Sequence, residues 1–487
     1  DQFGGSRQIT HGTERIDVGS DRMDDITFAL QYTENKTPYG NESITRDIGF
    51  TGVLGYTYDD RFLADLTVRE NASSQFGADN RWGLFWSAGI GWNIHNEKFM
   101  RELDWVKQLK IRGSIGTSGS QSFESYQSIA TYKYYTDVSY SGMLGAYVMR
   151  LANDNLKWQE KMDYNAGIDA RIWKFSFTFD YYESITDNLI VDLSLPTSVG
   201  FSSVKENIGK VKNSGFDIAF TYNIFSKGTG FLNLTGSLTT NKNKIMKLSD
   251  AMRAFNERQD ELVSTKEDGG RSKPVLRYVE GGSLNSIWAV PSLGINPANG
   301  REIYVRPDGT TTYTWQASDQ QIVGNSQEKF RGNFGFNGEY QGFGLSVIAR
   351  FTAGGDYYNQ TLVDKVENAD LKQNVDKRLL YGRWSEKNKN APFKTLQPYN
   401  DANGNYISAP KTEPTSRFVQ RKNEMTISSI SAWYDWRDRV WLDKAGISRL
   451  KLAFNMNDVC TISTIKMERG TSYPFARTMS FSLAVEF

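Results

Sequence analysis

The sequence predicts an all-β protein: a transmembrane antiparallel β-barrel, with residues 1–487 forming one barrel portion. Three observations support this fold class. The composition favours strands, apolar and polar side chains alternate with a period of two, and the long connections recur after every second strand.

The composition favours strands and tight turns over helices. Aromatic residues make up 13% of the chain, and there are 43 glycines but only 11 prolines. A net charge of +1 gives no reason to expect a nucleic-acid partner. No window approaches the ~18 to 20 apolar residues of a membrane-spanning helix, whereas a barrel strand needs only ~9 to 11 alternating residues.

Alternation is clearest at the end of the chain. Met479, Phe481, Leu483, Val485 and Phe487 alternate with small or polar residues, and residues 175–182 follow the same pattern. Applied along the chain, this pattern predicts about 14 strands. They are expected near 24–33, 46–58, 61–71, 82–93, 107–118, 160–172, 174–186, 211–225, 231–242, 328–341, 343–353, 424–436, 447–457 and 478–487.

The connections alternate in length. Most members of one set are short: 59–60, 173, 226–230, 342 and 437–446, with 94–106 the longest. The other set contains the long ones: 119–159, 187–210, 243–327, 354–423 and 458–477. Outer-membrane barrels have short periplasmic turns and long outer loops, so the long loops are expected to be extracellular and Phe487 periplasmic. A soluble sandwich or propeller is the alternative, but the chain has no repeat of fixed period.

Several ordered blocks resemble the SusC/RagA family of TonB-dependent importers. The first, GYTYDDRFLADLTVRENASSQFGADNRWGLFWSAGIGWNIHNEKFM at 55–100, contains Ser73-Ser74-Gln75-Phe76-Gly77, where many relatives have Ser-Ser-Arg-Phe-Gly. Others follow in order: LKIRGSIGTSGSQ at 109–121, NDNLKWQEKMDYNAGID at 153–169, LPTSVGF at 195–201, NIGKVKNSGFDI at 207–218, NPANGREIYVRPDG at 296–309 and the stretch 452–487.

The resemblance implies a 22-stranded barrel, of which this chain would be the last ~14 strands. It also implies localisation in the bacterial outer membrane and a SusD-like lipoprotein lid. TonB would act through a plug that is absent from this chain. The cargo would be an oligosaccharide or, alternatively, a peptide. An incomplete barrel leaves open edges in lipid, so the N-terminal part of the same barrel is an expected partner.

Aromatic residues are the candidate site residues. Trp288, Tyr313, Trp315, Tyr357, Tyr358 and Trp384 are predicted to lie in outer loops. They are expected either to contact substrate or lid, or to pack within the loops. Trp82, Trp86, Trp92 and Phe487 are predicted to belong to the interfacial aromatic girdle.

No catalytic or metal site and no cofactor is predicted. His11 and His95 are the only histidines, Cys460 is the only cysteine, and ordinary turn or packing roles are favoured for all three. Asp401, Asn403 and Asn405 have the spacing of a calcium loop, but Thr412 stands where the closing acid would be needed. A passive porin and an outer-membrane hydrolase are the alternatives to an importer.

Overall fold

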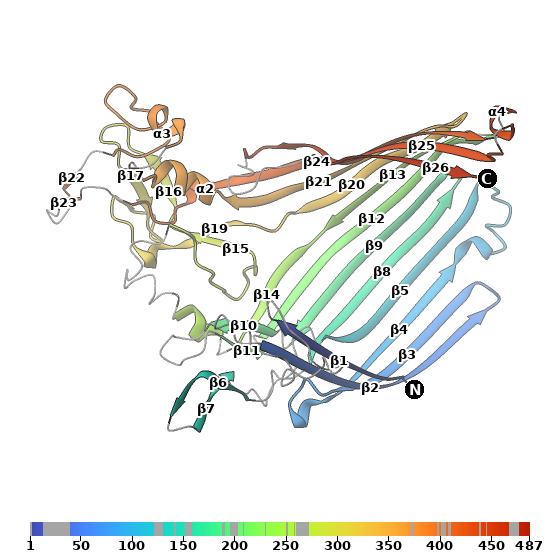
Figure 1. Cartoon of the computed structure of the whole chain (residues 1–487), viewed down its shortest axis with the longest axis horizontal. Helices are drawn as coiled ribbons and strands as arrows, with labels where there is room; N and C mark the ends of the chain where they lie inside the picture. Colours follow the sequence, from blue (N-terminus) through green and yellow to red (C-terminus); the bar gives the residue numbers. More distant parts are fainter. Residues whose placement is uncertain are drawn as a thin grey trace.

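One antiparallel sheet dominates the computed structural model. It has fifteen strands, and their order along the sheet is β1-β2-β3-β4-β5-β8-β9-β12-β13-β20-β21-β24-β25-β26, with β14 also paired to β12. Figure 1 shows these strands as one curved wall, with the larger loops gathered at one end. The structure describes residues 2–12, 39–120, 130–140, 143–150, 158–187, 190–194, 203–207, 209–228, 230–249, 252–257, 259, 272–370, 372, 375–396, 399–400, 406–407, 411–437, 440–444, 446–466 and 477–487.

The strands of the large sheet are β1 (Gln2–Gly12), β2 (Tyr39–Tyr58), β3 (Phe62–Ser73), β4 (Trp82–Asn93), β5 (Val106–Ser120), β8 (Gln159–Ile172), β9 (Phe175–Asp187), β12 (Gly209–Lys227), β13 (Gly230–Thr240), β14 (Lys242–Leu248), β20 (Phe330–Tyr340), β21 (Phe343–Tyr358), β24 (Val419–Arg437), β25 (Arg449–Ser463) and β26 (Met479–Glu486). The small strands are β6 (Thr131–Tyr140), β7 (Met143–Arg150), β10 (Ile190–Ser194), β11 (Ser203–Asn207), β15 (Ser286–Ala289), β16 (Ser292–Ile295), β17 (Glu302–Val305), β18 (Thr311–Thr312), β19 (Gln321–Asn325), β22 (Tyr399–Asn400) and β23 (Tyr406–Ile407). The helical segments are η2 (Ala78–Asn80), η3 (Ile94–Asn96), η5 (Ala317–Asp319), α2 (Gln360–Leu362), η6 (Val363–Glu367), α3 (Lys377–Tyr381), η7 (Ser416–Phe418) and α4 (Val440–Asp443).

Thirteen of the fourteen predicted strands correspond to strands of the large sheet, from β2 to β26; the fourteenth, at 24–33, lies outside the described residues. The sequence did not predict β14, which lies almost wholly in the predicted loop 243–327, or β1 at Gln2–Gly12. The reason is compositional: QFGGSRQITHG has few apolar residues, so a period of two is hard to detect there.

The alternation of connection lengths is also confirmed. At one end the strands are joined by tight turns, and Asp59 and Asp60 both have positive φ, at 51° and 52°. Gln341 and Gly342 repeat this at 50° and 90°. Two successive residues with positive φ are typical of the type I′ hairpin turn, whose twist matches that of the strands. The described parts of the long connections leave the opposite end of the sheet (Figure 1).

Several strands continue past their predicted outer ends. β21 runs to Tyr358 rather than 353, β24 starts at Val419 rather than 424, and β25 ends at Ser463 rather than 457. The β21–β24 register shifts between Thr352 and Gly355, so a bulge carries the pair outward beyond the regular ladder. The sheet therefore forms the base on which the outer loops stand.

The two faces of the sheet differ in chemistry. On β9, the rings of Phe175, Phe177 and Phe179 alternate with Ser176 and Thr178. Antiparallel pairing places the first set beside Phe220 and Ile218 of β12, so apolar residues share one face across neighbouring strands. This is the arrangement of a barrel wall with lipid outside and a polar lumen inside.

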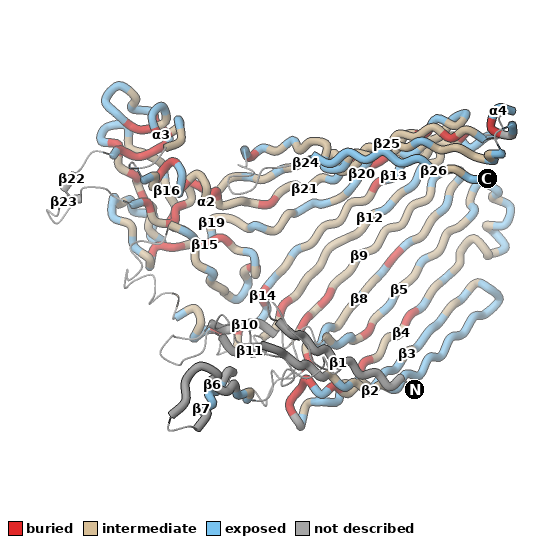
Figure 2. The backbone as a smooth tube through the Cα atoms, viewed as in Figure 1, coloured by how far each residue is buried: buried red, intermediate tan, exposed pale blue. Residues whose placement is uncertain are grey.

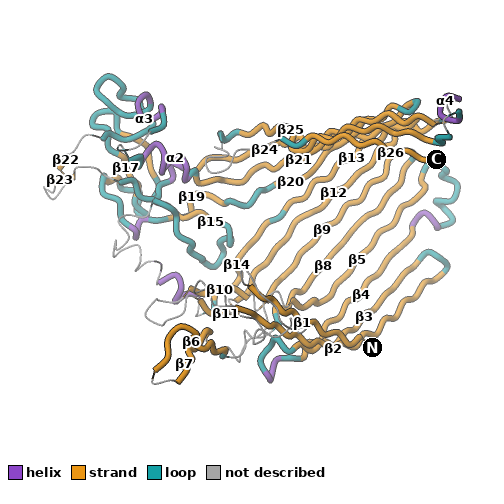
Figure 3. The backbone as a smooth tube through the Cα atoms, in the orientation of Figure 1, coloured by secondary structure: helices purple, strands orange, loops and turns teal. Residues whose placement is uncertain are grey.

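The buried residues gather mainly outside the wall (Figure 2). The larger core cluster consists of Val363, Val366, Leu379, Phe393 and Phe418, all within the segment 359–418. The helices are short and lie in the connections rather than in the sheet (Figure 3). Among the described residues, no helix has the length and apolar character needed to cross a membrane.

Candidate functional site

Two long loops fold together at the outer end of the sheet. We call residues 272–325 and 359–418 the loop assembly; the first segment precedes β20 and the second joins β21 to β24. Val290 of the first pairs with Thr415 of the second as an isolated parallel bridge. The backbone N–H of Thr395 donates to the carbonyl of Gly300 at 2.9 Å. The two loops therefore act as one folded unit.

A cluster of buried charges lies where the two loops meet. Arg417 donates from Nη2 to Glu302 at 2.9 Å and to Glu367 at 2.6 Å, so it joins a carboxylate from each loop. Arg383 donates to the backbone carbonyls of Val366 and Lys394, the latter at 3.0 Å. The side chains of Glu302, Glu367 and Arg417 are 2%, 0% and 11% exposed. Buried charges are tolerated when they are paired in this way.

The pKa values of the cluster follow from this packing. Burial opposes the charged form of Arg417, but Glu302 and Glu367 outweigh it and raise the pKa of this guanidinium. Burial lowers the pKa of Lys394 to about 8, although Glu367 and Glu302 act in the opposite direction. The cluster holds three cations, Arg383, Lys394 and Arg417, but only two carboxylates, Glu302 and Glu367. The positive charge of Lys394 is therefore the one least compensated by a carboxylate.

Most predicted loop aromatics pack inside the loop assembly. Trp288 and Trp384 are only 8% and 9% exposed, and Trp384 donates from its indole nitrogen to the carbonyl of Pro297 at 3.0 Å. Trp315 donates to the carbonyl of Pro414 at 3.1 Å. The indoles of Trp315 and Trp384 therefore join the two loops to each other.

The tyrosines differ among themselves. Tyr313 is 37% exposed, the most exposed of the six loop aromatics. The guanidinium of Arg301 lies over its ring, 4.6 Å from the centroid. Tyr357 and Tyr358 were expected in a loop but lie in β21, because that strand continues past its predicted end. Tyr358 donates to the carbonyl of Ser272 at 3.0 Å and ties the strand to the loop assembly.

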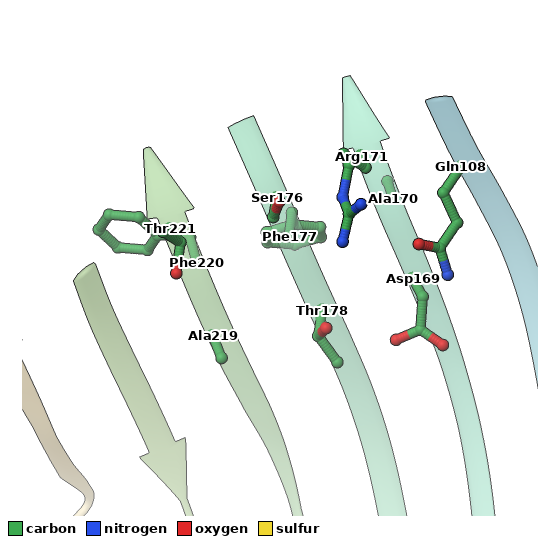
Figure 4. Close-up of a pocket in the computed structure, with 10 residues that line it drawn as sticks. All are labelled: Gln108, Asp169, Ala170, Arg171, Ser176, Phe177, Thr178, Ala219, Phe220 and Thr221. Carbon is green, nitrogen blue, oxygen red and sulfur yellow. The ribbon is translucent and has the colours of Figure 1, made fainter. Parts of the chain in front are cut away.

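The lumen face carries a second group of charges that the sequence did not single out. Arg112 of β5 bonds to Asp169 at 3.0 Å, to Asn165 at 3.1 Å and to Asp180 at 2.7 Å, across β8 and β9. Beside it lies a shallow hollow of about 240 Å³ lined by Gln108, Asp169, Ala170, Arg171, Ser176, Phe177, Thr178, Ala219, Phe220 and Thr221. Figure 4 shows these residues on neighbouring strands. The sequence signal that could have identified this group is Arg112, a charged residue on the polar face of a strand with alternating apolar and polar residues.

The predicted girdle residues occupy defined heights. Trp82 and Trp92 lie at the two ends of β4, and Trp86 lies between them. Ten residues of a strand tilted by ~45° rise ~24 Å, which is close to the ~25 Å apolar band of such barrels. Phe487 follows β26 at the tight-turn end and is 91% exposed. The girdle role of all four stays a prediction.

The two histidines, Cys460 and the segment 401–405 were the other residues considered for catalysis or metal binding. His95 lies in η3, where Nδ1 is 3.1 Å from the carbonyl oxygen of Leu109. Cys460 is a half-buried thiol in β25. His11 falls in β1, and 401–405 lies outside the described residues. Within the described part of the chain, no three His, Cys, Asp or Glu side chains are grouped as a metal site would need.

Comparison with known proteins gives the family. The family described as "TonB dependent receptor-like, beta-barrel" matches residues 3–271, more than half of the chain. The chain belongs to this family. TonB-dependent receptor P39 of Formosa agariphila is 24% identical over 91% of this chain and 45% of its own length. TonB-dependent receptor SusC of Bacteroides thetaiotaomicron is 28% identical over 42% of this chain and 21% of its own.

The solved structures support the same fold. The RagAB peptide transporter matches this TonB-dependent receptor barrel with a TM-score of 0.74 at 20% identity, over 92% of this chain and 47% of that one. The predicted SusC/RagA type and the outer-membrane localisation are confirmed. The chain spans about half the length of the curated relatives that match most of it.

Proposed function

We propose that this barrel portion belongs to an importer that takes up oligosaccharides across the outer membrane, driven by TonB and capped by a SusD-like lipoprotein. The observation that carries the proposal is the family match together with an antiparallel wall that extends outward into a folded loop assembly. Peptide import by the same mechanism is the alternative, since a RagAB peptide transporter shares the fold.

The architecture supports a partnership with further strands. In the described sheet, β1 and β26 each pair on one side only. Unpaired strand edges are untenable in lipid, so we infer that strands from the N-terminal part of the same barrel join both edges. The plug and its contact with TonB would belong to that part.

The loop assembly is the proposed surface for substrate or lid. Its charged core and its indole hydrogen bonds hold the two loops in one arrangement before any ligand binds, which lowers the ordering cost of binding. Tyr313 is the most exposed of the six loop aromatics, which suits stacking on a sugar or packing against a lid.

The test is gentle extraction of the full-length protein from its native membrane, followed by mass spectrometry of everything that co-purifies. Recovery of a SusD-like lipoprotein and a bound oligosaccharide is expected, and a bound peptide would select the alternative. Uptake of the recovered ligand should stop when TonB is depleted. Unchanged uptake without TonB, with no lipoprotein recovered, would identify a passive porin instead.

A further inference from the structure

The ladder between β4 and β5 stops early. Only seven residue pairs join β4 to β5, from Ser87–Gly116 to Asn93–Lys110. Eleven pairs join β3 to β4 and fourteen join β5 to β8. Among neighbours along the described sheet from β1 to β26, the β4–β5 ladder is the shortest.

Both strands continue outward beyond this ladder without pairing to each other. Trp82 still pairs with Ala72 of β3, and Ser120 still pairs with Gln159 of β8. The segments 82–86 and 117–120 therefore face each other across an unpaired seam, which we call the outer seam. A side-chain bond crosses it, from the backbone N–H of Trp86 to Oγ1 of Thr117, at 3.1 Å.

An aromatic side chain fills the outer seam. A Cβ added to Gly119 of β5 would lie 2.1 Å from Cζ of Phe85, and one added to Gly83 would lie 2.7 Å from the same atom. The Phe85 ring of β4 therefore reaches β5, and the glycines provide its space. Phe85 is 6% exposed although it lies beyond the β4–β5 ladder, paired only with Arg69 of β3.

Two further aromatics hold Phe85 in place. The rings of Phe76 and Trp158 lie 4.2 Å apart between centroids, and those of Phe85 and Trp158 lie 5.4 Å apart. Trp158 donates from its indole nitrogen to the carbonyl of Arg81 at 3.1 Å, so it joins the start of β8 to the connection before β4. Phe76 and Trp158 come from two of the sequence blocks noted above, SSQFG and NLKW, and here they form one packing unit.

We propose that the outer seam is a joint in the barrel wall, closed by Phe85, Phe76 and Trp158, that can part and so widen the extracellular mouth. A ladder of backbone hydrogen bonds must break cooperatively, whereas an aromatic wedge can shift with fewer bonds lost. The size of admitted cargo would then depend on this joint, an extension that rests on the proposed import function.

Hydrogen exchange of the full-length protein in detergent tests the joint without reference to import. Amides of 82–86 and 117–120 should exchange at least tenfold faster in Phe85→Ala than in wild type, while those of 87–93 and 110–116 stay unchanged. Phe99→Ala, at an exposed phenylalanine in the connection between β4 and β5 at the other end of the sheet, is the control. Unchanged exchange at 82–86 and 117–120 in Phe85→Ala would overturn the proposal.

Chemical labelling tests the effect on the mouth. Ser87→Cys, on the lumen side below the seam in a Cys460→Ser background, would be labelled on cells with polyethylene-glycol maleimides of increasing mass. Phe85→Ala should admit larger reagents, and a disulfide across the seam, from Trp86→Cys with Thr117→Cys, should exclude them until it is reduced. A disulfide within the paired ladder, from Ala88→Cys with Ile115→Cys, should have no effect.

One size limit shared by wild type, Phe85→Ala and the seam disulfide would refute the widening. Because neither readout involves transport, the joint can stand if the import proposal fails. Should Phe85→Ala not assemble, Trp158→Phe offers a milder variant that keeps the ring and removes the bond to Arg81. It should raise exchange in the same segments to a smaller extent.

Discussion

At the scale of single residues, Arg417 has the largest electrostatic role in the loop assembly. It neutralises one carboxylate from each loop, and neither Glu302 nor Glu367 has another cation as close. A buried pair contributes little compared with an apolar isostere, yet removing one partner leaves a charge stranded. At the neighbouring Lys394, burial outweighs the attraction of the two carboxylates and lowers the pKa of the ammonium group.

Replacing Arg417 with Met should destabilise the loop assembly by about 3 to 5 kcal/mol, because two buried carboxylates lose their partner. Faster proteolytic cleavage within 272–325 and 359–418 of the purified protein would show this. Arg421→Met is the matched control, since the Arg421–Asp356 pair at 2.8 Å is half exposed and should change stability by less than about 1 kcal/mol. Equal effects of the two variants would contradict the prediction.

The loop assembly should become more stable as the pH rises from about 8 to 10. The folded pKa of Lys394 is lowered to about 8 from 10.5, so in this window the unfolded state binds more protons than the folded state. Stability therefore increases with pH here, by at most about 3 kcal/mol. Limited proteolysis across this range, corrected with an unfolded standard, measures it. Lys394→Met should abolish the dependence; a variant that keeps it would exclude this lysine as its source.

At the scale of elements, the last three strands are clamped at the tight-turn end. Asp435 of β24 accepts from Arg449 of β25 at 2.7 Å, and Arg449 reaches Glu486 of β26 at 3.0 Å. The Asp435 side chain is fully buried, whereas β26 has β25 as its only partner in the described sheet. The clamp therefore secures a strand that has one free edge.

Asp435→Ala should lower the temperature at which the folded full-length protein converts to the unfolded form on a denaturing gel. Arg449 and Arg437 would both lose Asp435 as their acceptor, at a cost of about 1 to 2 kcal/mol because these guanidiniums are partly exposed. Asp458→Asn provides the control, because its contact with Arg350 at 3.4 Å is exposed on both sides and asparagine tolerates the positive φ of 47° at this position. If both variants convert at the wild-type temperature, the clamp does not secure the strand.

At the scale of the whole molecule, the sequence was sufficient for the wall and insufficient for the loops. Alternation identified β9 and β26 because lipid and lumen impose opposite chemistry on successive residues. No such rule applies to Trp384, which is 9% exposed and donates to Pro297 of a partner loop more than eighty residues away in the sequence. The bulge that extends β21 to Tyr358 likewise depends on tertiary pairing.

The outer seam between β4 and β5 could not be predicted from the sequence either. Phe85 occupies a polar-face position of β4, and only the spatial meeting of Gly83, Gly119 and Trp158 shows why an aromatic is accepted there. The sequence resemblance located SSQFG and NLKW but gave no reason for them. The structure supplies a packing reason.

The pairing of the two outer loops has a consequence for how such proteins diversify. Because Arg417 of one loop neutralises Glu302 of the other, a change of length or sequence in either loop alone disturbs the charge balance of both. At the opposite end, the two-residue turns at 59–60 and 341–342 have positive φ values, and an insertion there would disturb the twist match between the strands. Chimeras that aim to change the cargo bound should therefore replace 272–325 and 359–418 together and leave the strands of the wall unchanged.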